Sequence, residues 1–399
     1  MGGHFLGAGE DIANNLAFWE SESWSPMGDG QEFIKDLHSF DGGLYAVGSV
    51  GTGGVVSWDG AAWSMVGGEF TGGYASPTRA LVDHEGLLHV GGSFTEYDGA
   101  PGFARVARWE DPVWVPLGTG ISGVSVDAFA VHDDELYAGG DFTTSGGQAT
   151  ANIARWDGVT WHPLGDGLDD KVEALFSDGD RLIAVGEFQQ AGGAPAAGVA
   201  AWQDGAWTPL GDNVSGTVYA VTRFETKLII AGGFTLLDDP ATKGLAAWNG
   251  ERWEAVVADA PNYIFDMEVR GAQLWLAGTF FDAGGLPSQG VAVFEALPTG
   301  VEEGASAAKP LTLKPVYPNP FNPKTTVNFT LGVEGPVRLS IHDVQGRRLR
   351  VLVDRALPIG DHDFTWDGRD EVGRELPSGV YFSRLRAEGE SHSGKLVLS

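Results

Sequence analysis

The segment Leu136–Gly165 has the sequence LYAGGDFTTSGGQATANIARWDGVTWHPLG, and most of the chain repeats its pattern. A short apolar run ends in two glycines and an aromatic residue, and a glycine-rich loop follows. A second apolar run ends at Trp156, and a third begins at Trp161. The dipeptide Asp157-Gly158 between them tolerates the positive φ that two-residue hairpin turns need. The segment therefore predicts short antiparallel strands joined by tight turns.

Pairs of tryptophans five residues apart recur along the first three quarters of the chain. Their first members are spaced 39, 51, 47, 46 and 46 residues apart, and Phe294 stands 46 residues after the last of them. A motif of glycine and an aromatic residue recurs in step, in seven copies if the degenerate one at Gly48 is included. A further apolar run precedes each glycine motif, so each repeat has room for four strands. The pairs are Trp19/Trp24, Trp58/Trp63, Trp109/Trp114, Trp156/Trp161, Trp202/Trp207 and Trp248/Trp253.

Four strands in a repeat of about 46 residues predict an all-β fold of the β-propeller type. One four-stranded sheet cannot bury both of its faces, whereas sheets stacked around an axis cover each other. Each tryptophan would bury about 150–250 Å² between sheets. Seven glycine motifs favour seven blades, and the alternative is a six-bladed ring closed by N-terminal strands. Because the chain begins in mid-repeat, we expect a truncated N-terminus from which an export signal and at least one strand are missing.

Within residues 1–297 the repeat resembles the kelch repeat. The shared features are an apolar run, Gly-Gly, an aromatic residue before Asp-Gly, and a tryptophan followed by Pro-Leu. The resemblance implies a propeller, in a family whose functions range from protein binding to copper-radical oxidation. The oxidase form needs a cysteine linked to a tyrosine, and this chain has no cysteine. We therefore do not expect that activity.

The composition changes near residue 310. Residues 298–310 are small and polar, as expected of a linker. Residues 311–399 hold 12 of the 25 Lys and Arg residues and 11 of the 54 Asp and Glu residues, which leaves 13 basic and 43 acidic residues in 1–310. Seven or so short apolar runs after the linker predict a small β-sandwich.

Five short motifs follow one another in residues 316–399. They are Tyr317-Pro318-Asn319-Pro320-Phe321-Asn322-Pro323, Thr325-Thr326, Asp343-Val344-Gln345-Gly346-Arg347, Trp366-Asp367-Gly368-Arg369-Asp370 and Pro377-Ser378-Gly379-Val380-Tyr381-Phe382. Because all five occur in this order along the chain, together they resemble the C-terminal sorting domain of the type IX secretion system. They also resemble its relative, the Ig-like domain of flagellar hook-capping proteins (FlgD). The resemblance implies export across the outer membrane of a diderm bacterium, with the secretion machinery as partner. Structural roles fit the same residues: prolines fix an extended strand, Trp366 packs in a sandwich and Gly379 makes a turn. The expected sorting-motif residues are Tyr317, Pro318, Asn319, Pro320, Phe321, Asn322, Pro323, Gly379 and Tyr381.

The charge and composition exclude several function classes. The formal net charge of -29 argues against nucleic acid as a partner. No apolar run is long enough to span a bilayer, and the start MGGHFLGAGE lacks the features of a signal peptide. Without cysteine, disulfides, thiolate metal sites and a cysteine nucleophile are excluded.

No constellation of residues names a reaction, and no catalytic residue is chosen. Asp166, Asp169 and Asp170 are candidate calcium ligands, although solvated turns explain them more simply. The nine histidines show no recurring zinc spacing and are expected at surface or hairpin positions.

Two functions remain open. The first is an exported, non-catalytic binding or structural propeller that takes a glycan or protein ligand. The second is an extracellular polysaccharide hydrolase or lyase with its site at the mouth of the propeller's central channel, which needs polar residues converging from several blades. We expect such a site at the irregular loops 67–78 and 95–103.

Overall fold

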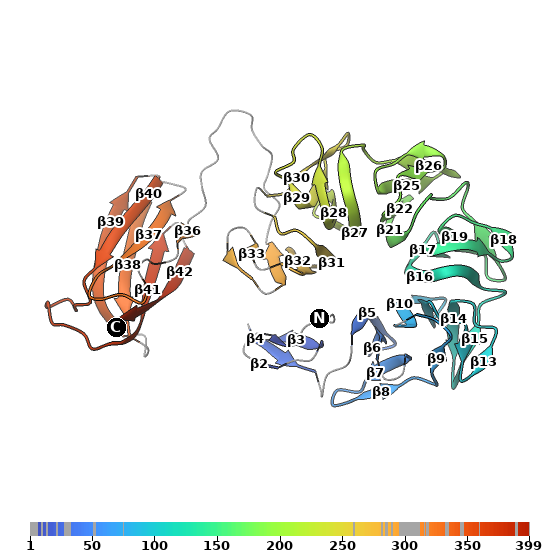
Figure 1. Cartoon of the computed structure of the whole chain (residues 1–399), viewed down its shortest axis with the longest axis horizontal. Helices are drawn as coiled ribbons and strands as arrows, with labels where there is room; N and C mark the ends of the chain where they lie inside the picture. Colours follow the sequence, from blue (N-terminus) through green and yellow to red (C-terminus); the bar gives the residue numbers. More distant parts are fainter. Residues whose placement is uncertain are drawn as a thin grey trace. The chain divides into compact units, whose positions relative to one another are not determined.

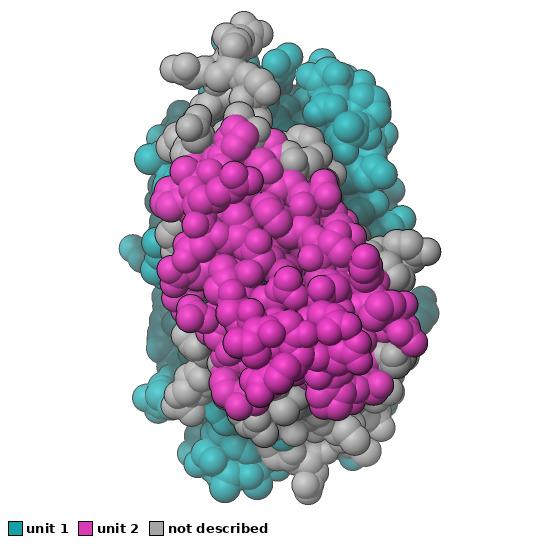
Figure 2. Space-filling view, turned by 90° about the vertical axis from the view of Figure 1, so that its left-hand side faces the viewer, with its two compact units in different colours: residues 1–299 teal, residues 300–399 magenta. Residues whose placement is uncertain are grey.

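The computed structural model describes residues 7–8, 11–12, 15–20, 23–27, 33–50, 53–74, 76–257, 260–280, 282–283, 286–288, 290–294, 312–314, 316, 319–331, 335–343, 347–358, 360–387 and 390–398. All secondary-structure elements in these ranges are β-strands, which confirms the predicted all-β class. No helix there is suited to cross a membrane. The chain divides into two compact units, residues 1–299 and 300–399, which Figure 2 distinguishes by colour.

The described part of the first unit contains six larger antiparallel sheets, here called sheets I to VI (Figure 1). Within each sheet the main strands follow one another in chain order. Sheet I has β5 (Ile34–Phe40), β6 (Gly43–Gly48), β7 (Val55–Trp58) and β8 (Trp63–Met65), and sheet II has β10 (Thr78–His84), β11 (Leu87–Gly92), β14 (Val106–Glu110) and β15 (Val113–Pro116). Sheet III has β16 (Ile121–His132), β17 (Glu135–Ser145), β19 (Ile153–Trp156) and β20 (Trp161–Pro163), and sheet IV has β21 (Val172–Asp178), β22 (Arg181–Gly186), β25 (Val199–Gln203) and β26 (Ala206–Pro209). Sheet V has β27 (Val214–Phe224), β28 (Lys227–Leu236), β29 (Lys243–Trp248) and β30 (Trp253–Ala255), and sheet VI has β31 (Ile264–Arg270), β32 (Gln273–Gly278) and β35 (Val291–Phe294).

Shorter strands accompany these sheets. A hairpin of β3 (Ala17–Glu20) and β4 (Ser23–Pro26) precedes sheet I, and β18 (Gln148–Ala149) extends sheet III. The other short strands of the first unit are β1 (Gly7–Ala8), β2 (Asp11–Ile12), β9 (Phe70–Thr71), β12 (Glu96–Tyr97), β13 (Ala100–Pro101), β23 (Gln190–Ala191), β24 (Ala194–Pro195), β33 (Asp282–Ala283) and β34 (Leu286–Pro287).

Successive sheets share apolar cores. Between sheets IV and V, for example, Ile183 and Phe234 belong to one buried cluster. The hairpin β3–β4 shares a cluster with sheet I, which includes Met27 beside β4. The same hairpin also contacts sheet VI, because the ring of Trp275 lies 6.1 Å from that of Trp19 and 6.4 Å from that of Trp24.

The paired tryptophans connect each sheet to the preceding one. In four of the pairs the indole N–H of the second tryptophan donates a hydrogen bond to the carbonyl of the residue just after the preceding sheet or hairpin, as Trp253 Nε1 does to Leu210 O at 2.6 Å. The first tryptophan packs against the glycine that follows this carbonyl, since a Cβ at Gly211 would lie 3.0 Å from the ring of Trp248. Equivalent hydrogen bonds join Trp63 to Met27, Trp114 to Val66 and Trp207 to Leu164. Trp161 Nε1, in sheet III, is buried without such a bond among the described residues.

The Asp-Gly and Asn-Gly turns between the tryptophans are closed by their first residue. Asp157 Oδ1 accepts hydrogen bonds from the backbone N–H groups of Val159 at 2.9 Å and Thr160 at 2.8 Å. Asp59 and Asn249 do the same in their turns. The bonds from the backbone, chiefly that of Thr160, hold the pKa of Asp157 below its usual range.

The second unit contains two antiparallel sheets around one core. The apolar cluster includes Phe329 from one sheet and Leu339 and Leu385 from the other. Gly379 does not make the predicted turn: it is the first residue of β41 and pairs with Leu398. One sheet has the order β36 (Thr312–Leu313), β37 (Thr325–Leu331), β40 (Gly360–Trp366), and the other has β39 (Arg348–Leu357), β38 (Gly335–His342), β41 (Gly379–Ala387), β42 (Glu390–Leu398).

Candidate functional site

The first strand of each of sheets I to VI carries a β-bulge at the same place. One residue of the first strand is left without a partner on the second strand. A bulge bends its strand and re-aims the extra side chain, and bulges are frequent beside active sites. The six extra residues, here called the bulge residues, are Lys35, Arg79, Asp127, Glu173, Tyr219 and Phe265.

The recurring glycine of the sequence motif is explained by the bulge. The glycines that face the bulges are Gly48, Gly92, Gly140, Gly186, Gly232 and Gly278. A Cβ at any of them would lie 1.9–2.2 Å from the backbone oxygen two residues before the bulge residue. No side chain fits so close to a backbone atom, so only glycine is tolerated there. The preceding glycine of the pair, as at Gly139, faces Val172 and Leu175 of the next sheet and leaves room for their side chains.

Four bulge residues are charged, and three of them form an ion-pair network with Lys171. Arg79 Nη1 lies 2.8 Å from Asp127 Oδ1. Lys171 Nζ lies 2.8 Å from Glu173 Oε1 and 3.9 Å from Asp127 Oδ1. Lys35 has no ion-pair partner within the described residues and is exposed.

Burial and the crowding of like charges shift the pKa values of the charged bulge residues. Although the side chain of Lys35 reaches solvent, the protein atoms around it lower its pKa, and the charges of Arg79 and Lys171 lower it further. Burial raises the pKa of Glu173, against the opposing effect of Lys171. The charges of Asp127 and Glu187 also raise the pKa of Glu173.

The other two bulge residues are aromatic. Tyr219 and Phe265 have ring centroids 5.2 Å apart in a T-shaped arrangement. Tyr263, two residues before Phe265, has a φ of 59°, which bulky residues seldom adopt. Its ring passes over Gly233, where a Cβ would lie 3.0 Å from it. Because Tyr263 is 51% exposed and Phe265 47% exposed, these aromatic side chains offer apolar surface for contact with a ligand.

The residue after each bulge residue distinguishes sheets I and VI from the others. It is alanine in sheets II to V but aspartate at Asp36 and Asp266. Asp36 Oδ2 accepts a hydrogen bond from Leu81 N at 2.7 Å, and burial raises its pKa. The side chain of Asp266 is exposed, yet the surrounding protein raises its pKa to about 6, and the charge of Asp36 adds to the effect. The two carboxyl groups are therefore near enough to interact electrostatically.

The candidate calcium ligands serve the turn before sheet IV. Asp169 Oδ1 accepts hydrogen bonds from the backbone N–H groups of Gln189 and Gln190, both at 2.8 Å. Asp170 Oδ1 accepts one from Lys171 N at 2.8 Å, and Asp166 is exposed. Among the residues that the structure describes, no three His, Asp or Glu side chains are grouped to hold a metal ion. Calcium binding stays a prediction.

The irregular loops 67–78 and 95–103 pair with each other. They contribute β9, β12 and β13 to one small sheet. Tyr97 Oη accepts a hydrogen bond from Gly68 N at 2.8 Å, and Asp98 Oδ1 accepts one from Glu69 N at 2.9 Å. The polar residues that come together from several sheets are on the first strands instead of on these loops.

Among the described histidines, His89 departs from the expected surface or hairpin position. His89 is buried in β11, with its ring 5.8 Å from that of His84, which lies at the end of a hairpin. Burial lowers the pKa of His89 to about 4. This imidazole is therefore neutral at physiological pH.

The described part of the sorting motif combines buried and exposed residues. Phe321 is buried, and its ring centroid lies 5.4 Å from that of Trp366. Asn319 joins the motif to β42: its Nδ2 donates to Lys395 O, and its Oδ1 accepts from Val397 N, both at 2.8 Å. Tyr317 and Pro318 lie outside the described residues. The exposed members are Asn319, Pro320, Asn322 and Pro323.

Tyr381 completes the aromatic core beside this motif. Its ring lies 5.3 Å from that of Trp366, and its hydroxyl donates a hydrogen bond to Pro377 O at 2.6 Å. Gly379 begins the strand that carries Tyr381. These residues have structural roles, as predicted for Trp366.

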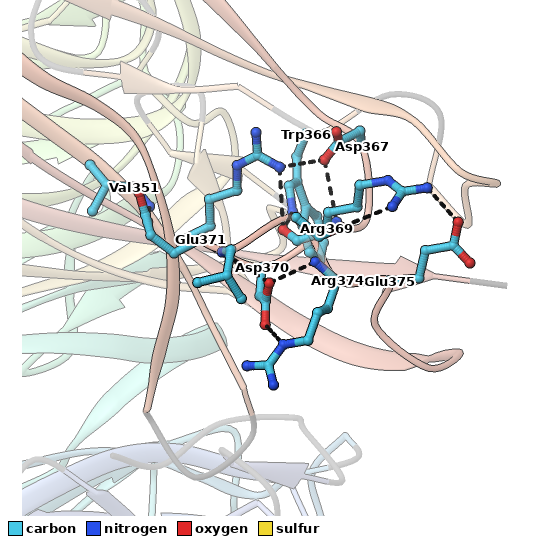
Figure 3. A network of polar contacts seen from close by, with 11 residues as sticks. Val351, Trp366, Asp367, Arg369, Asp370, Glu371, Arg374 and Glu375 are labelled. Carbon is cyan, nitrogen blue, oxygen red and sulfur yellow. Dashed lines mark hydrogen bonds and ion pairs between the residues drawn. The ribbon is translucent and has the colours of Figure 1, made fainter.

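A polar network holds the loop after Trp366 (Figure 3). Asp370 Oδ1 accepts a hydrogen bond from Arg374 N at 2.9 Å, and its Oδ2 accepts one from Arg374 Nε at 3.0 Å. Asp343 and Arg347 make the same two bonds, at 2.9 and 3.0 Å. The sequence signal is the repeated pattern Asp-x-x-Gly-Arg, whose second copy sequence reasoning missed. Both copies close surface loops.

Sequence reasoning also missed the bulge residues. The feature that marks them in the sequence is a fixed spacing: each bulge residue lies 13 residues before the glycine that faces its bulge. The residue type varies at this position, so a search for a shared motif passes over it.

The comparisons with known proteins cover the two units differently. Residues 321–391 match the family described as FlgD Ig-like domain. No curated protein matches the chain.

Among the solved structures that are similar to the chain are three of low sequence identity. One is PorZ, an essential bacterial surface component of the type-IX secretion system of Porphyromonas gingivalis, with 16% identity and a TM-score of 0.44 over 95% of this chain and 61% of PorZ. The chain thus spans less than two thirds of the length of PorZ. A fungal alcohol oxidase of the AA5 family, in complex with copper, has 12% identity and a TM-score of 0.42 over 94% and 88%. Dimeric latent PorU from Porphyromonas gingivalis has 9% identity and a TM-score of 0.20 over 79% and 32%.

The match at residues 321–391 coincides with the two-sheet unit and its core of Phe321, Trp366 and Tyr381. The predicted Ig-like fold of the C-terminal region is confirmed. The second unit contains an Ig-like domain similar to that of FlgD.

Proposed function

We propose that the first unit is a seven-bladed propeller of kelch-like repeats. Sheets I to VI would be six blades, and the hairpin β3–β4 the outer part of the seventh. The proposal is supported by the apolar cores between successive sheets. It is also supported by the two contacts of the hairpin, with sheet I through Met27 and with sheet VI through Trp275. A series of sheets that returns to its beginning is a ring.

We propose that this propeller is a non-catalytic binding module. The observation that carries the proposal is the set of bulge residues. Glycine and tryptophan recur because the fold needs them, whereas the bulge side chain differs in every sheet and the fold does not dictate it. Variation at a structurally repeated position, with charged and aromatic side chains, supports a role in recognition.

We propose that the second unit is a sorting domain that directs export by the type IX system, so that the protein is secreted or displayed at the cell surface. The ordered motifs and the FlgD-type match support it. The secretion machinery would be the partner, and the exposed residues Pro320, Asn322 and Pro323 offer it a surface beside the buried Phe321.

Export is tested in the native host by surface proteolysis. Deletion of residues 316–399 is expected to leave the first unit in the periplasm. The point variant Asn322→Ala should reduce surface exposure while the fold is kept, because Asn322 is exposed. Arg355→Ala, an exposed change in β39, is the matched control. Unchanged surface display after the deletion would reject the sorting role.

Binding is tested with arrays of glycans and of surface proteins, probed with the full chain. Selective capture of some ligands, lost in Phe265→Ala, would support the binding module. Capture that is unchanged in this variant would remove the bulge residues from the proposal.

The alternative function is that of a polysaccharide hydrolase or lyase whose active site lies beside the bulge residues. The observation in its favour is the interacting pair Asp36 and Asp266, whose raised pKa values suit general acid catalysis. Release of reducing ends from a polysaccharide panel, abolished in Asp266→Asn, would establish it. Absence of turnover on substrates that the chain binds would reject it.

A further inference from the structure

The bulge residues have three parts with different chemistry. Lys35 and Arg79 are neighbouring cations, Asp127 and Glu173 are neighbouring carboxylates, and Tyr219 is followed by Phe265. Successive members interact in space: Arg79 with Asp127 by an ion pair, and Tyr219 with Phe265 by ring contact. The bulge residues thus provide a cationic, an acceptor and an aromatic section, and Glu173 of the acceptor section acts electrostatically on Tyr219 of the aromatic one.

The cationic section leaves a positive charge available to pair with an anionic ligand. Lys35 is exposed and has no ion-pair partner in the described parts of the chain, while Arg79 and Lys171 repel it. Asp127 and Glu173 pair with Arg79 and Lys171, which leaves Lys35 as the cation of this group without an ion-pair partner in the described residues. An anionic group placed against Lys35 and Arg79 would relieve the repulsion through charge-assisted hydrogen bonds.

The aromatic section suits a flat, partly apolar ligand face. Phe265 and Tyr263 are about half exposed, and exposed aromatic side chains gain free energy when an apolar face covers them. The unusual φ of Tyr263 fits this role, since backbone strain of this kind clusters at ligand-binding positions. Between the two sections, the carboxylate of Glu173 can accept hydrogen bonds from hydroxyl groups, whereas both oxygens of Asp127 are bonded, to Arg79 and to Ser125.

We propose that the bulge residues bind an acidic sugar residue of a glycan, an inference that rests on the proposed binding function. The sugar carboxylate would lie against Lys35 and Arg79. Its hydroxyl groups would donate to Glu173, and its ring face would cover Phe265 and Tyr219. A sugar acid combines the three required features, whereas a neutral sugar leaves the cationic section unpaired.

The test is calorimetric titration of the full chain with pairs of trisaccharides. The acidic members are trimers of 1,4-linked galacturonic acid and of 1,4-linked mannuronic acid, and each is compared with the neutral trimer of the same linkage. At least one acidic trimer is expected to bind about tenfold or more tightly than its neutral partner. Its affinity should fall with added salt, because exposed charges are screened.

Three variants assign the binding to these residues. Lys35→Met keeps the length of the side chain without its charge and should weaken binding of the acidic trimer about tenfold. Phe265→Ala should weaken it about fivefold through the lost ring contact. Lys243→Met, an equally conservative change at an exposed lysine of β29, should leave it unchanged. Both functional positions are exposed, so the variants are expected to fold.

Several outcomes would overturn the inference. These are equal affinity for acidic and neutral trimers, unchanged binding in Lys35→Met, and no binding of any trimer at about 1 mM. The binding function itself is judged by the arrays of glycans and proteins. Capture of another ligand there, without acidic sugars, would reject this inference and leave the proposed binding module in place.

Discussion

The tryptophan pairs allow the hydrogen bond between sheets to be isolated. Trp253 and Trp161 occupy the same position in sheets V and III and are both fully buried. Trp253 Nε1 donates to Leu210 O at 2.6 Å, whereas Trp161 Nε1 is buried without a hydrogen-bond partner. Replacing either with phenylalanine removes a similar volume, but only Trp253→Phe breaks a hydrogen bond.

The difference between the two variants follows from the cost of unpaired polar groups. Trp253→Phe loses a hydrogen bond and leaves the carbonyl of Leu210 unpaired, which costs about 2 kcal/mol beyond the loss of packing. Trp161→Phe removes an unpaired buried donor and recovers about 1 kcal/mol of its desolvation penalty. We therefore expect Trp253→Phe to lower the free energy of unfolding by about 3 kcal/mol more than Trp161→Phe does.

The measurement is urea unfolding of the full chain, followed by circular dichroism because fluorescence changes with the tryptophan count. Trp207→Phe is the control, since Trp207 Nε1 donates to Leu164 O at 3.0 Å. It should resemble Trp253→Phe. Equal losses in Trp253→Phe and Trp161→Phe, or a larger loss in Trp161→Phe, would refute the reasoning that the N–H group matters.

Three more predictions concern the bulges, pH and the second unit. Gly232→Ala should lower the free energy of unfolding by about 3 kcal/mol or more, because a Cβ would lie 2.2 Å from Thr217 O; Gly335→Ala, where a Cβ meets nothing within 4 Å, is the control in the same urea assay, and equal effects would contradict the account. Asp266 has a folded-state pKa of about 6, above its unfolded value near 4, so its contribution to stability is complete below about pH 4 and lost as the pH rises through 6. Asp266→Asn should remove this decline from urea unfolding curves measured across that range, and a parallel decline in both proteins would count against it. Phe321→Ala should destabilise the second unit by about 3–5 kcal/mol, seen as an earlier thermal transition of that unit; an unshifted transition would show that Phe321 is dispensable for its core.

The repeat and its turns are predictable from the sequence because their causes are local. Asp157-Gly158 specifies a turn through the backbone torsions it allows and through the side-chain oxygen that closes it. The five-residue spacing of Trp156 and Trp161 places them opposite each other across that turn. In the second unit, the order of short motifs around Phe321 was enough to predict an Ig-like fold.

The candidate site depends on tertiary structure. A bulge shifts the alternation of side chains along a strand by one residue. Only the strand register shows that Arg79 and Asp127 both lie at bulges and occupy equivalent positions in their sheets. The sequence also does not tell that Lys35, from sheet I, shares an electrostatic environment with Glu173, from sheet IV.

The sequence by itself determined the repeated unit, because turns, glycine contacts and strand patterns act over a few residues. The tertiary structure alone decided which side chains meet. Contacts between residues some 46 positions apart arise only when each sheet packs on the next through its own apolar face. That packing then brings together charged and aromatic residues whose sequence contexts have nothing in common.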